Sequence, residues 1–301
     1  MSELTESHRA MGEPHCQVLS ADGISLSYSV LGDEDAPVLL LLHSLGTDGR
    51  MWEDCIGDLV ADHRLIVPDT RGHGASAPAR AQSAQLWADD IDRIVRDAGA
   101  TVVALAGVSM GGIQAIAYAA AHPDQVRALI VADSFLVLSE RVRDDKVATL
   151  ANDIDTAPMS RIAQDYLAAT FIEPYPAGAE QVAAAITVID PGSYLAATAA
   201  CFGVDIVPQA AQVAAPTLVL WGDRDGKTPR PLAEQIQRTI PGAVLDVIPD
   251  AGHLSNVDNP AGFCRAVRSF LNDKGPADSS APSVTEAHMR WLACHVGTKS
   301  K

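Results

Sequence analysis

The chain has 301 residues, 48% of them hydrophobic and 20% charged, so it can bury a sizeable core and is not globally disordered. This length fits one large α/β domain, or one domain that carries an insertion. Lys and Arg number 22 against 38 Asp and Glu, which gives a formal net charge of −16. That acidity, with no run of Lys or Arg to offset it, argues against nucleic acid or an anionic membrane as a partner.

The cysteines and the N-terminal residues indicate the compartment. The cysteines are odd in number and lack the close spacing of a metal site, which is typical of free thiols in a reducing cytosol. Residues 1–13 are polar with mixed charge, unlike a secretory signal. No window approaches eighteen uninterrupted apolar residues. We therefore predict a cytoplasmic protein without a membrane span. The cysteines are Cys16, Cys55, Cys201, Cys264 and Cys294.

The first part of the chain alternates short apolar runs with amphipathic segments. Apolar and polar positions alternate on both sides of Asp22-Gly23, which predicts an antiparallel hairpin over residues 16–31. The regular alternation of strand and helix after it predicts the α/β class, with a mostly parallel, doubly wound sheet. The predicted strands are 38–42, 64–67, 102–108 and 126–132, and the predicted helices are 51–61, 85–98 and 113–121.

After Asp133 the alternation stops. Residues 134–212 contain helical patterns but no convincing buried strand, which predicts a helical cap over the carboxyl edge of the sheet. The sheet pattern then resumes, so we predict an α/β core made of residues 16–133 and 213–272. Residues 1–15 are predicted to be a flexible leader, and 273–301 a linker with a short tail. The remaining predicted helices are 142–154, 160–170, 179–189, 194–201, 230–239, 260–271 and 285–296, and the remaining strands are 216–222 and 243–248.

One stretch combines a buried strand, a sharp turn and a helix. Gly107-Val108-Ser109-Met110-Gly111 has the Gly-x-Ser-x-Gly pattern of a nucleophile elbow at the junction of strand and helix. Such a turn forces its middle residue into strained dihedral angles and leaves no room for side chains at the flanking positions. The pattern therefore predicts that the Ser109 hydroxyl stands clear of the backbone, beside a helix N-terminus that favours negative charge.

Two further groups follow later strands, and ligands of open α/β sheets bind at the carboxyl ends of the strands. Asp225 follows the strand at 216–222, and His253 follows the last strand. We expect His253 to take the proton of Ser109, while Asp225 fixes the histidine tautomer and offsets its charge. The backbone N–H groups of Leu45 and Met110 are the predicted oxyanion hole.

Other residues compete for these roles. Asp133 ends the strand after the elbow and is an alternative triad acid, because some hydrolases take their acid from that position. Asp223 is more typical of a turn former. Asp69 and His73 are predicted to fix their own loop by hydrogen bonds rather than to act in catalysis.

Several motifs occur together in this order: His43-Ser44-Leu45-Gly46-Thr47-Asp48, Arg50-Met51-Trp52, residues 69–76 (DTRGHGAS), residues 107–112 (GVSMGG) and residues 251–256 (AGHLSN). In combination they resemble the 3-oxoadipate enol-lactonases of the α/β-hydrolase superfamily, over about residues 16–272. Two positions depart from that pattern. Pro68 stands where an aromatic residue is frequent, and Gly226-Lys227 stands where short apolar residues are usual.

The resemblance implies a ring-opening hydrolase of aromatic catabolism, with Ser109, Asp225 and His253 as the triad and Leu45 and Met110 as the oxyanion hole. We therefore predict a serine hydrolase that opens a lactone or cleaves a carboxylic ester through an acyl-enzyme, with no metal or organic cofactor and a small-molecule substrate as its partner. A general carboxylesterase or a carbon–carbon bond hydrolase would use the same triad. Outside the enzymes, a receptor with slow turnover is the alternative.

An acidic substrate would need a local positive site on so acidic a protein. The predicted partners of its carboxylate are Arg141, Arg143 or Arg161 in the cap, or Arg71 in the core. The sequence leaves open whether the protein forms a homo-oligomer.

Overall fold

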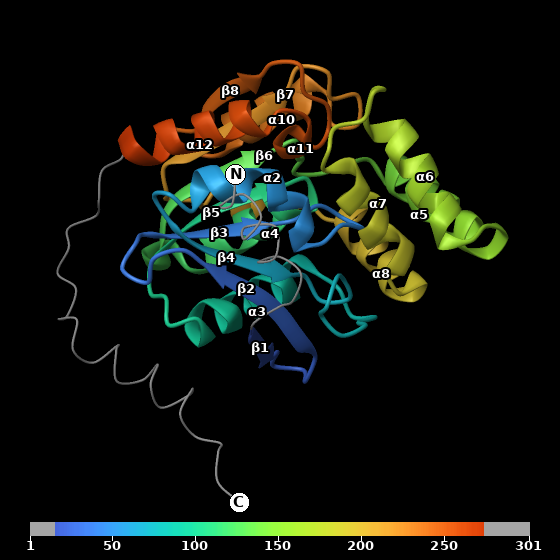
Figure 1. Ribbon diagram of the computed structural model, residues 1–301, viewed down its shortest axis with the longest axis horizontal. Coiled ribbons are helices and arrows are strands. Elements are labelled where there is room, and N and C mark those ends of the chain that lie inside the picture. Colours follow the sequence, from blue (N-terminus) through green and yellow to red (C-terminus); the bar gives the residue numbers. More distant parts are fainter. Residues whose placement is uncertain (1–15, 274–301) are drawn as a thin grey trace, which may run out of the picture.

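Eight strands form one sheet in the order β1-β2-β4-β3-β5-β6-β7-β8 (Figure 1). The computed structural model describes residues 16–273. β1, β2 and β4 pair antiparallel, and every later pair across the sheet is parallel. The strands are β1 (Cys16–Leu19), β2 (Ser25–Leu31), β3 (Val38–Leu42), β4 (Arg64–Asp69), β5 (Val103–Val108), β6 (Val126–Ala132), β7 (Thr217–Gly222) and β8 (Val244–Ile248).

The central strands are apolar throughout because both faces of the sheet are covered. In β3, Leu39 and Leu41 pack into one core cluster, while Leu40 and Leu42 pack into the other, as the two-residue period of a strand requires. One face carries α3 (Ala84–Asp97), α4 (Met110–Ala121), α9 (Val207–Ala210) and α10 (Arg230–Thr239). The other carries α2 (Glu53–Leu59), α11 (Ser255–Asp258) and α12 (Pro260–Asp273).

Five helices lie between β6 and β7, and the first four of them form a separate layer on the right of Figure 1. They pack mainly as two pairs, α6 with α7 and α5 with α8, and α7 also contacts the 3-10 turn η1 (Gly49–Trp52). α5 buries none of its residues, so one of its faces is available to line a cavity. The four helices are α5 (Glu140–Thr156), α6 (Met159–Thr170), α7 (Ala179–Val188) and α8 (Pro191–Phe202).

The predicted α/β class and its mostly parallel sheet are confirmed, and the element boundaries differ by only a few residues. The helix expected at 51–61 begins as η1 and continues as α2 to Leu59. The short elements η2 (Pro123–Gln125), α9 and α11 had not been predicted from the sequence. The helix expected at 285–296 lies outside the described residues.

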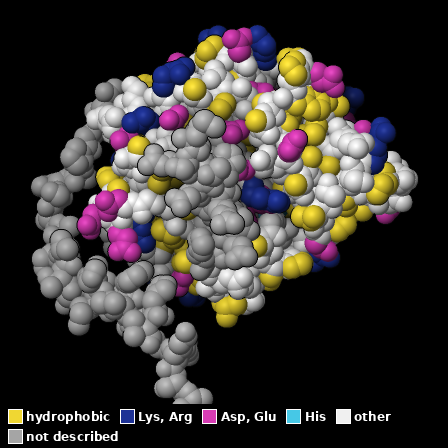
Figure 2. Space-filling model, in the orientation of Figure 1, with side chains coloured by type: hydrophobic (Ala, Val, Ile, Leu, Met, Phe, Trp, Pro, Cys, Tyr) yellow, Lys and Arg dark blue, Asp and Glu magenta, His cyan; other side chains and the backbone are white. Residues whose placement is uncertain are grey.

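Charged side chains of both signs are interspersed on the face shown in Figure 2, without a broad basic area. Within residues 16–273, no single helix has both the length and the apolar character needed to cross a membrane. Among the described helices, α7 and α8 reach that length and apolar character only when taken together, and a bend of 111° separates them.

Candidate active site

Ser109 occupies a strained turn between β5 and α4. Its φ is 56° and its ψ is −116°, a backbone conformation that residues other than glycine rarely adopt. A Cβ at Gly107 would lie 2.1 Å from the carbonyl oxygen of Gly111, and a Cβ at Gly111 would lie 2.2 Å from that of Leu42. The turn therefore requires both glycines of the motif. The Ser134 hydroxyl, which follows β6, stabilises the turn by donating to the Ser109 carbonyl oxygen at 2.7 Å.

The side chains of Ser109, His253 and Asp225 form one chain of hydrogen bonds. His253 Nε2 lies 3.0 Å from Ser109 Oγ, and His253 Nδ1 lies 3.0 Å from Asp225 Oδ2. Because an ionised carboxylate can only accept, Nδ1–H donates to Asp225 and leaves Nε2 as the acceptor for the serine hydroxyl. All three residues are buried, so bulk water does not compete for these contacts. The arrangement can move a proton from the hydroxyl to the imidazole.

Asp225 is held in place by the loop that follows β7. Its Oδ1 accepts from the backbone N–H groups of Lys227 at 2.8 Å and Thr228 at 2.9 Å. The Thr228 hydroxyl donates to Oδ2 beside His253. Burial by itself raises the pKa of the Asp225 carboxyl, but the hydrogen bonds from His253 and Thr228 outweigh it and hold that pKa below its usual value. Asp225 is therefore negatively charged at neutral pH.

Asp133, the alternative acid, points to different partners. It also has a positive φ, of 47°, directly after β6. Its carboxylate accepts from the N–H of Gly222 at 2.8 Å and from the N–H of Ser255 at 3.1 Å. Burial and the charge of Asp225 raise the pKa of Asp133 to about 8. Asp133 thus ties the ends of β6, β7 and the His253 loop together, and it is Asp225 that contacts the imidazole.

Two backbone N–H groups are free beside the serine. Met110 is the first residue of α4, where the N–H has no acceptor within the helix. Leu45 lies in the turn after β3 and, with Ser44 and Ser109, lines the same cavity. Over residues 16–273 neither N–H has a hydrogen-bond acceptor. Both remain available to a negatively charged oxygen.

Ser109 and His253 open onto a cavity of about 320 Å³ between the sheet and the layer of helices α5–α8. The Phe135, Tyr194 and Phe202 rings supply much of its apolar wall. Phe135 and Phe202 are stacked, with ring centroids 5.9 Å apart. The mixture of apolar walls and a few convergent polar groups is typical of a site for a small organic molecule. No group of three or more metal-binding side chains is assembled anywhere in the described part of the chain.

A family model described as the alpha/beta hydrolase fold matches residues 37–260. The match covers most of the chain and includes Ser109 and His253. This protein belongs to the α/β-hydrolase family.

Individual relatives are esterases, lactonases and other hydrolases. A 3-oxoadipate enol-lactonase 2 of Acinetobacter baylyi is 27% identical over 255 residues, which cover 84% of this chain and 95% of the relative. The crystal structure of a hydrolase from Pseudomonas aeruginosa PA01 has a TM-score of 0.80 at 28% identity and covers 87% of this chain and 99% of its own. A thermophilic esterase from Thermogutta terrifontis, solved with malate bound, has a TM-score of 0.77 at 28% identity, covering 86% and 98%. The predicted resemblance to enol-lactonases is therefore confirmed.

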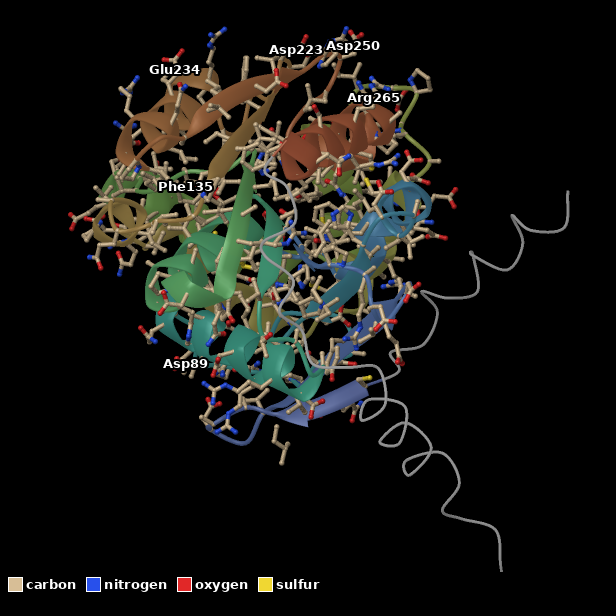
Figure 3. All side chains as sticks on the ribbon, turned by 90° about the vertical axis from the view of Figure 1, so that its left-hand side faces the viewer. Asp89, Phe135, Asp223, Glu234, Asp250 and Arg265 are labelled. Atoms are coloured by element: carbon tan, nitrogen blue, oxygen red, sulfur yellow. The ribbon has the colours of Figure 1, made fainter. Side chains whose placement is uncertain are left out.

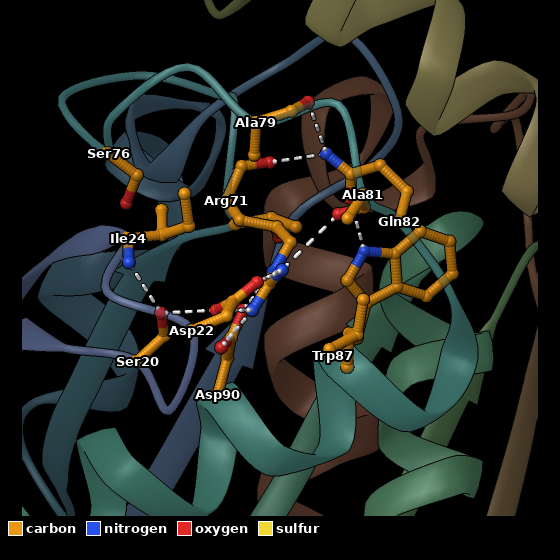
Figure 4. A network of polar contacts seen from close by, with 12 residues as sticks. Ser20, Asp22, Ile24, Arg71, Ser76, Ala79, Ala81, Gln82, Trp87 and Asp90 are labelled. Carbon is orange, nitrogen blue, oxygen red and sulfur yellow. Dashed lines mark hydrogen bonds and ion pairs between the residues drawn. The ribbon is translucent and has the colours of Figure 1, made fainter.

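The arginines expected to bind a substrate carboxylate are engaged elsewhere in this α/β-hydrolase, so that prediction is wrong. Arg71 is buried and forms ion pairs with Asp90 at 2.6 Å and with Asp22 at 2.9 Å, in the network of Figure 4. This network joins the β1–β2 turn to α3 and fills the donor capacity of the guanidinium. The three cap arginines each pair with an acidic neighbour on their own helix and do not line the cavity: Arg141 with Asp145, Arg143 with Asp144 and Arg161 with Asp165.

The other candidates have structural contacts. Asp223 lies near Asp250 at the outer edge of the molecule in Figure 3, where it accepts from the Ala251 N–H at 3.3 Å. Asp69 accepts from the N–H of Gly49 at 2.9 Å and from that of Ala75 at 2.8 Å, which fixes two turns.

His73 is buried without charge, since burial lowers its pKa to about 3.

Thr228 had not been recognised from the sequence as a partner of Asp225. Its position three residues after Asp225, where an Asp side chain commonly accepts from the backbone, was the available signal.

Proposed function

We propose that this protein is a serine hydrolase that opens lactones or cleaves carboxylic esters through an acyl-enzyme on Ser109. The observation that carries the proposal is the continuous hydrogen-bonded chain from Ser109 Oγ through His253 to Asp225, at the floor of a cavity with apolar walls. A serine hydroxyl is a poor nucleophile until a base takes its proton, and this geometry supplies that base.

In the first step, Ser109 Oγ attacks the substrate carbonyl carbon while its proton passes to His253 Nε2. The carbonyl oxygen becomes negatively charged and accepts from the N–H groups of Leu45 and Met110. Asp225 stabilises the imidazolium that forms. When the tetrahedral intermediate collapses, the bond to the leaving oxygen breaks and His253 returns the proton to that oxygen. The acyl group then remains on Ser109.

In the second step, a water molecule enters beside the acyl carbon. His253 removes one proton from the water, and the resulting hydroxide attacks the acyl carbon through a second tetrahedral intermediate. The bond to Ser109 Oγ breaks, His253 protonates that oxygen, and the carboxylic acid product leaves. In a lactone the acyl group and the leaving oxygen belong to one molecule, so no product leaves the cavity until this second step is complete.

The choice between lactones and open-chain esters is supported by the relatives. Residues 43–48 and 69–76 resemble the enol-lactonases, and an enol-lactonase of Acinetobacter baylyi matches most of the chain. Other matching structures are esterases. In an enol lactone the leaving oxygen is a stabilised enolate, so hydrolysis of the acyl-enzyme would limit turnover. We propose this substrate class, acted on in the cytoplasm, with open-chain esters as slower substrates.

The test is a substrate panel assayed with the wild-type enzyme and Ser109→Ala. The panel contains an enol lactone, an aryl ester and a vinylogous diketone, whose cleavage would require carbon–carbon bond hydrolysis. We expect turnover of the lactone and the ester, and a loss of at least about three orders of magnitude in Ser109→Ala. Undiminished turnover in that variant would refute the proposal. Tight binding with negligible turnover would favour a receptor, and turnover of the diketone alone would favour a carbon–carbon bond hydrolase.

A further inference from the structure

The lysines of this chain are few and unevenly placed. They are Lys146, Lys227, Lys274, Lys299 and Lys301. The last three lie outside the described residues. Both lysines within the described residues line the cavity that contains Ser109 and His253. All other basic side chains in that part of the chain are arginines or histidines.

The two lysines come from different parts of the fold. Lys146 lies on α5 in the cap, and Lys227 lies in the loop after β7, two residues beyond Asp225. The Lys227 ammonium group donates to Thr170 Oγ1 at 2.6 Å and stands 3.9 Å from the centre of the Tyr166 ring. These partners are neutral, so they orient the ammonium group without cancelling its charge.

Both lysines are solvent-exposed residues that contribute a positive charge to the same cavity. Partial desolvation of its ammonium group in this cavity, together with the charge of Lys146, lowers the pKa of Lys227 to about 8. Within residues 16–273 neither lysine forms an ion pair with a carboxylate. An anion between the two groups would be attracted by both.

The cavity-lining acids do not fill that role. Asp165 pairs with Arg161 at 2.9 Å. Asp153 lies on the same helix as Lys146 but seven residues further on, about 10 Å along the axis. The arginines of the cap are each paired with an acid, so among the described residues that line the cavity the two lysines are the cations without a carboxylate partner.

We propose that Lys146 and Lys227 together bind a carboxylate on the acyl part of the substrate, an inference that rests on the proposed ester and lactone hydrolysis. In a lactone no part of the substrate leaves at acylation, so the carboxylate stays beside the lysines through both steps. Two ammonium groups at one cavity also explain how an acidic protein holds an anionic substrate.

The kinetic test compares two esters of the same shape that differ in charge. These are the mono-p-nitrophenyl ester of glutarate and p-nitrophenyl 5-methylhexanoate, in which an isopropyl group replaces the carboxylate. We expect Lys146→Met and Lys227→Met each to lower kcat/KM for the glutarate ester by about 10- to 100-fold, the usual effect of removing one charged hydrogen-bond partner. Their kcat/KM for the neutral ester should change less than about threefold. Lys227→Arg should retain the preference.

Arg141→Met is the matched control. It removes one positive charge from the same helix, but Arg141 is exposed and five residues before Lys146, which turns it by about 140° around the helix. It should change neither rate. Equal losses on both esters in the lysine variants would assign the lysines a structural role and overturn the proposal. So would an unchanged ratio of the two rates.

A binding measurement separates this inference from the proposed hydrolysis. Calorimetric titration of free glutarate into each protein requires no turnover. We expect at least about tenfold weaker binding in either lysine-to-methionine variant, and wild-type binding in Arg141→Met. If glutarate binds this way but neither ester is hydrolysed, the hydrolase proposal fails and the anion site stands. If Ser109-dependent hydrolysis occurs but glutarate binds all variants equally, the anion site fails alone.

The pH dependence of glutarate binding gives a second signature. The titratable groups of the same site are Lys146, Asp153, Asp165, Asp225 and His253, with Tyr166, whose pKa burial raises to about 12. Affinity should fall above about pH 8 as free Lys227 loses its proton. Lys227→Arg keeps its charge and should not show this fall, although the other groups are unchanged. The same fall in both proteins would contradict the assignment.

Discussion

Asp225→Asn tests the proposed role of the acid with almost no change of shape. In the native protein Asp225 Oδ1 accepts from two backbone N–H groups, at 2.8 and 2.9 Å, while Oδ2 faces His253 Nδ1 at 3.0 Å. An asparagine has one oxygen, and the two backbone donors will hold it at the Oδ1 position. Its NH2 group then faces His253 Nδ1 and donates to it.

This reversal changes the tautomer of the histidine. Nδ1 must become an acceptor, so the ring proton moves to Nε2, which then points at Ser109 Oγ and cannot take its proton. The variant also loses the negative charge opposite the imidazolium. In a serine protease the equivalent substitution lowers kcat by about 10⁴. We expect a loss of about 10³- to 10⁴-fold here, with little change in KM because the cavity walls are untouched.

The assay is steady-state hydrolysis of an aryl ester, with Asp133→Asn as the matched control. Asp133 accepts from backbone N–H groups of two other segments and does not contact His253. Asp133→Asn should therefore lower the free energy of unfolding by about 1–3 kcal/mol at about pH 5, where Asp133 is protonated, but reduce kcat less than about tenfold. The reverse pattern, with Asp133→Asn inactive and Asp225→Asn active, would refute the reasoning and assign the acid to Asp133.

Three further predictions concern stability. Gly111→Ala should lower the free energy of unfolding by about 3 kcal/mol, because its Cβ would meet a carbonyl oxygen at 2.2 Å. Gly57→Ala, which has open space around it in α2, should raise the free energy of unfolding by about 0.5–1 kcal/mol. Equal effects of the two variants in urea denaturation would contradict this prediction. Asp90→Ala should cost about 3 kcal/mol in the same assay, because it leaves the buried Arg71 short of a partner, and a cost under about 1 kcal/mol would show that the network contributes little. Burial raises the pKa of Asp133 to about 8 from 3.8, so its contribution to stability is greatest below pH 4 and is lost as the pH rises to 8. The stability of the wild type relative to Asp133→Asn should therefore fall between pH 5 and 8, and a constant difference would rule out that shift.

The sheet could be predicted because its signals are local. Apolar runs such as 38–42 and the alternation around Asp22-Gly23 determine strand and hairpin without reference to distant residues. The elbow was equally visible, since its Gly-x-Ser-x-Gly pattern is local and Gly107 is required by a contact within the turn, although Gly111 is required by the close approach of β3. The strand, hairpin and turn patterns can all be read from neighbouring residues.

The contacts that decide among candidates join distant segments, and the sequence could not provide them. Asp133 and Asp225 both follow strands. Only the three-dimensional contacts reveal that Asp133 accepts hydrogen bonds from Gly222 and Ser255, whereas Asp225 contacts His253. The partners of Arg71 lie 49 and 19 residues away, so its burial left no local signal. The meeting of Lys146 and Lys227 at one cavity is of the same kind.

The most direct test of the mechanism is covalent labelling with a fluorophosphonate, followed by mass spectrometry of the intact protein and of its peptides. The reagent reacts with a serine only when a base activates the hydroxyl. The account predicts one adduct per chain, located on Ser109, absent in Ser109→Ala and formed at least about a hundredfold more slowly in His253→Gln. An unlabelled wild-type protein, an adduct on another residue, or a labelling rate unaffected by His253→Gln would contradict it.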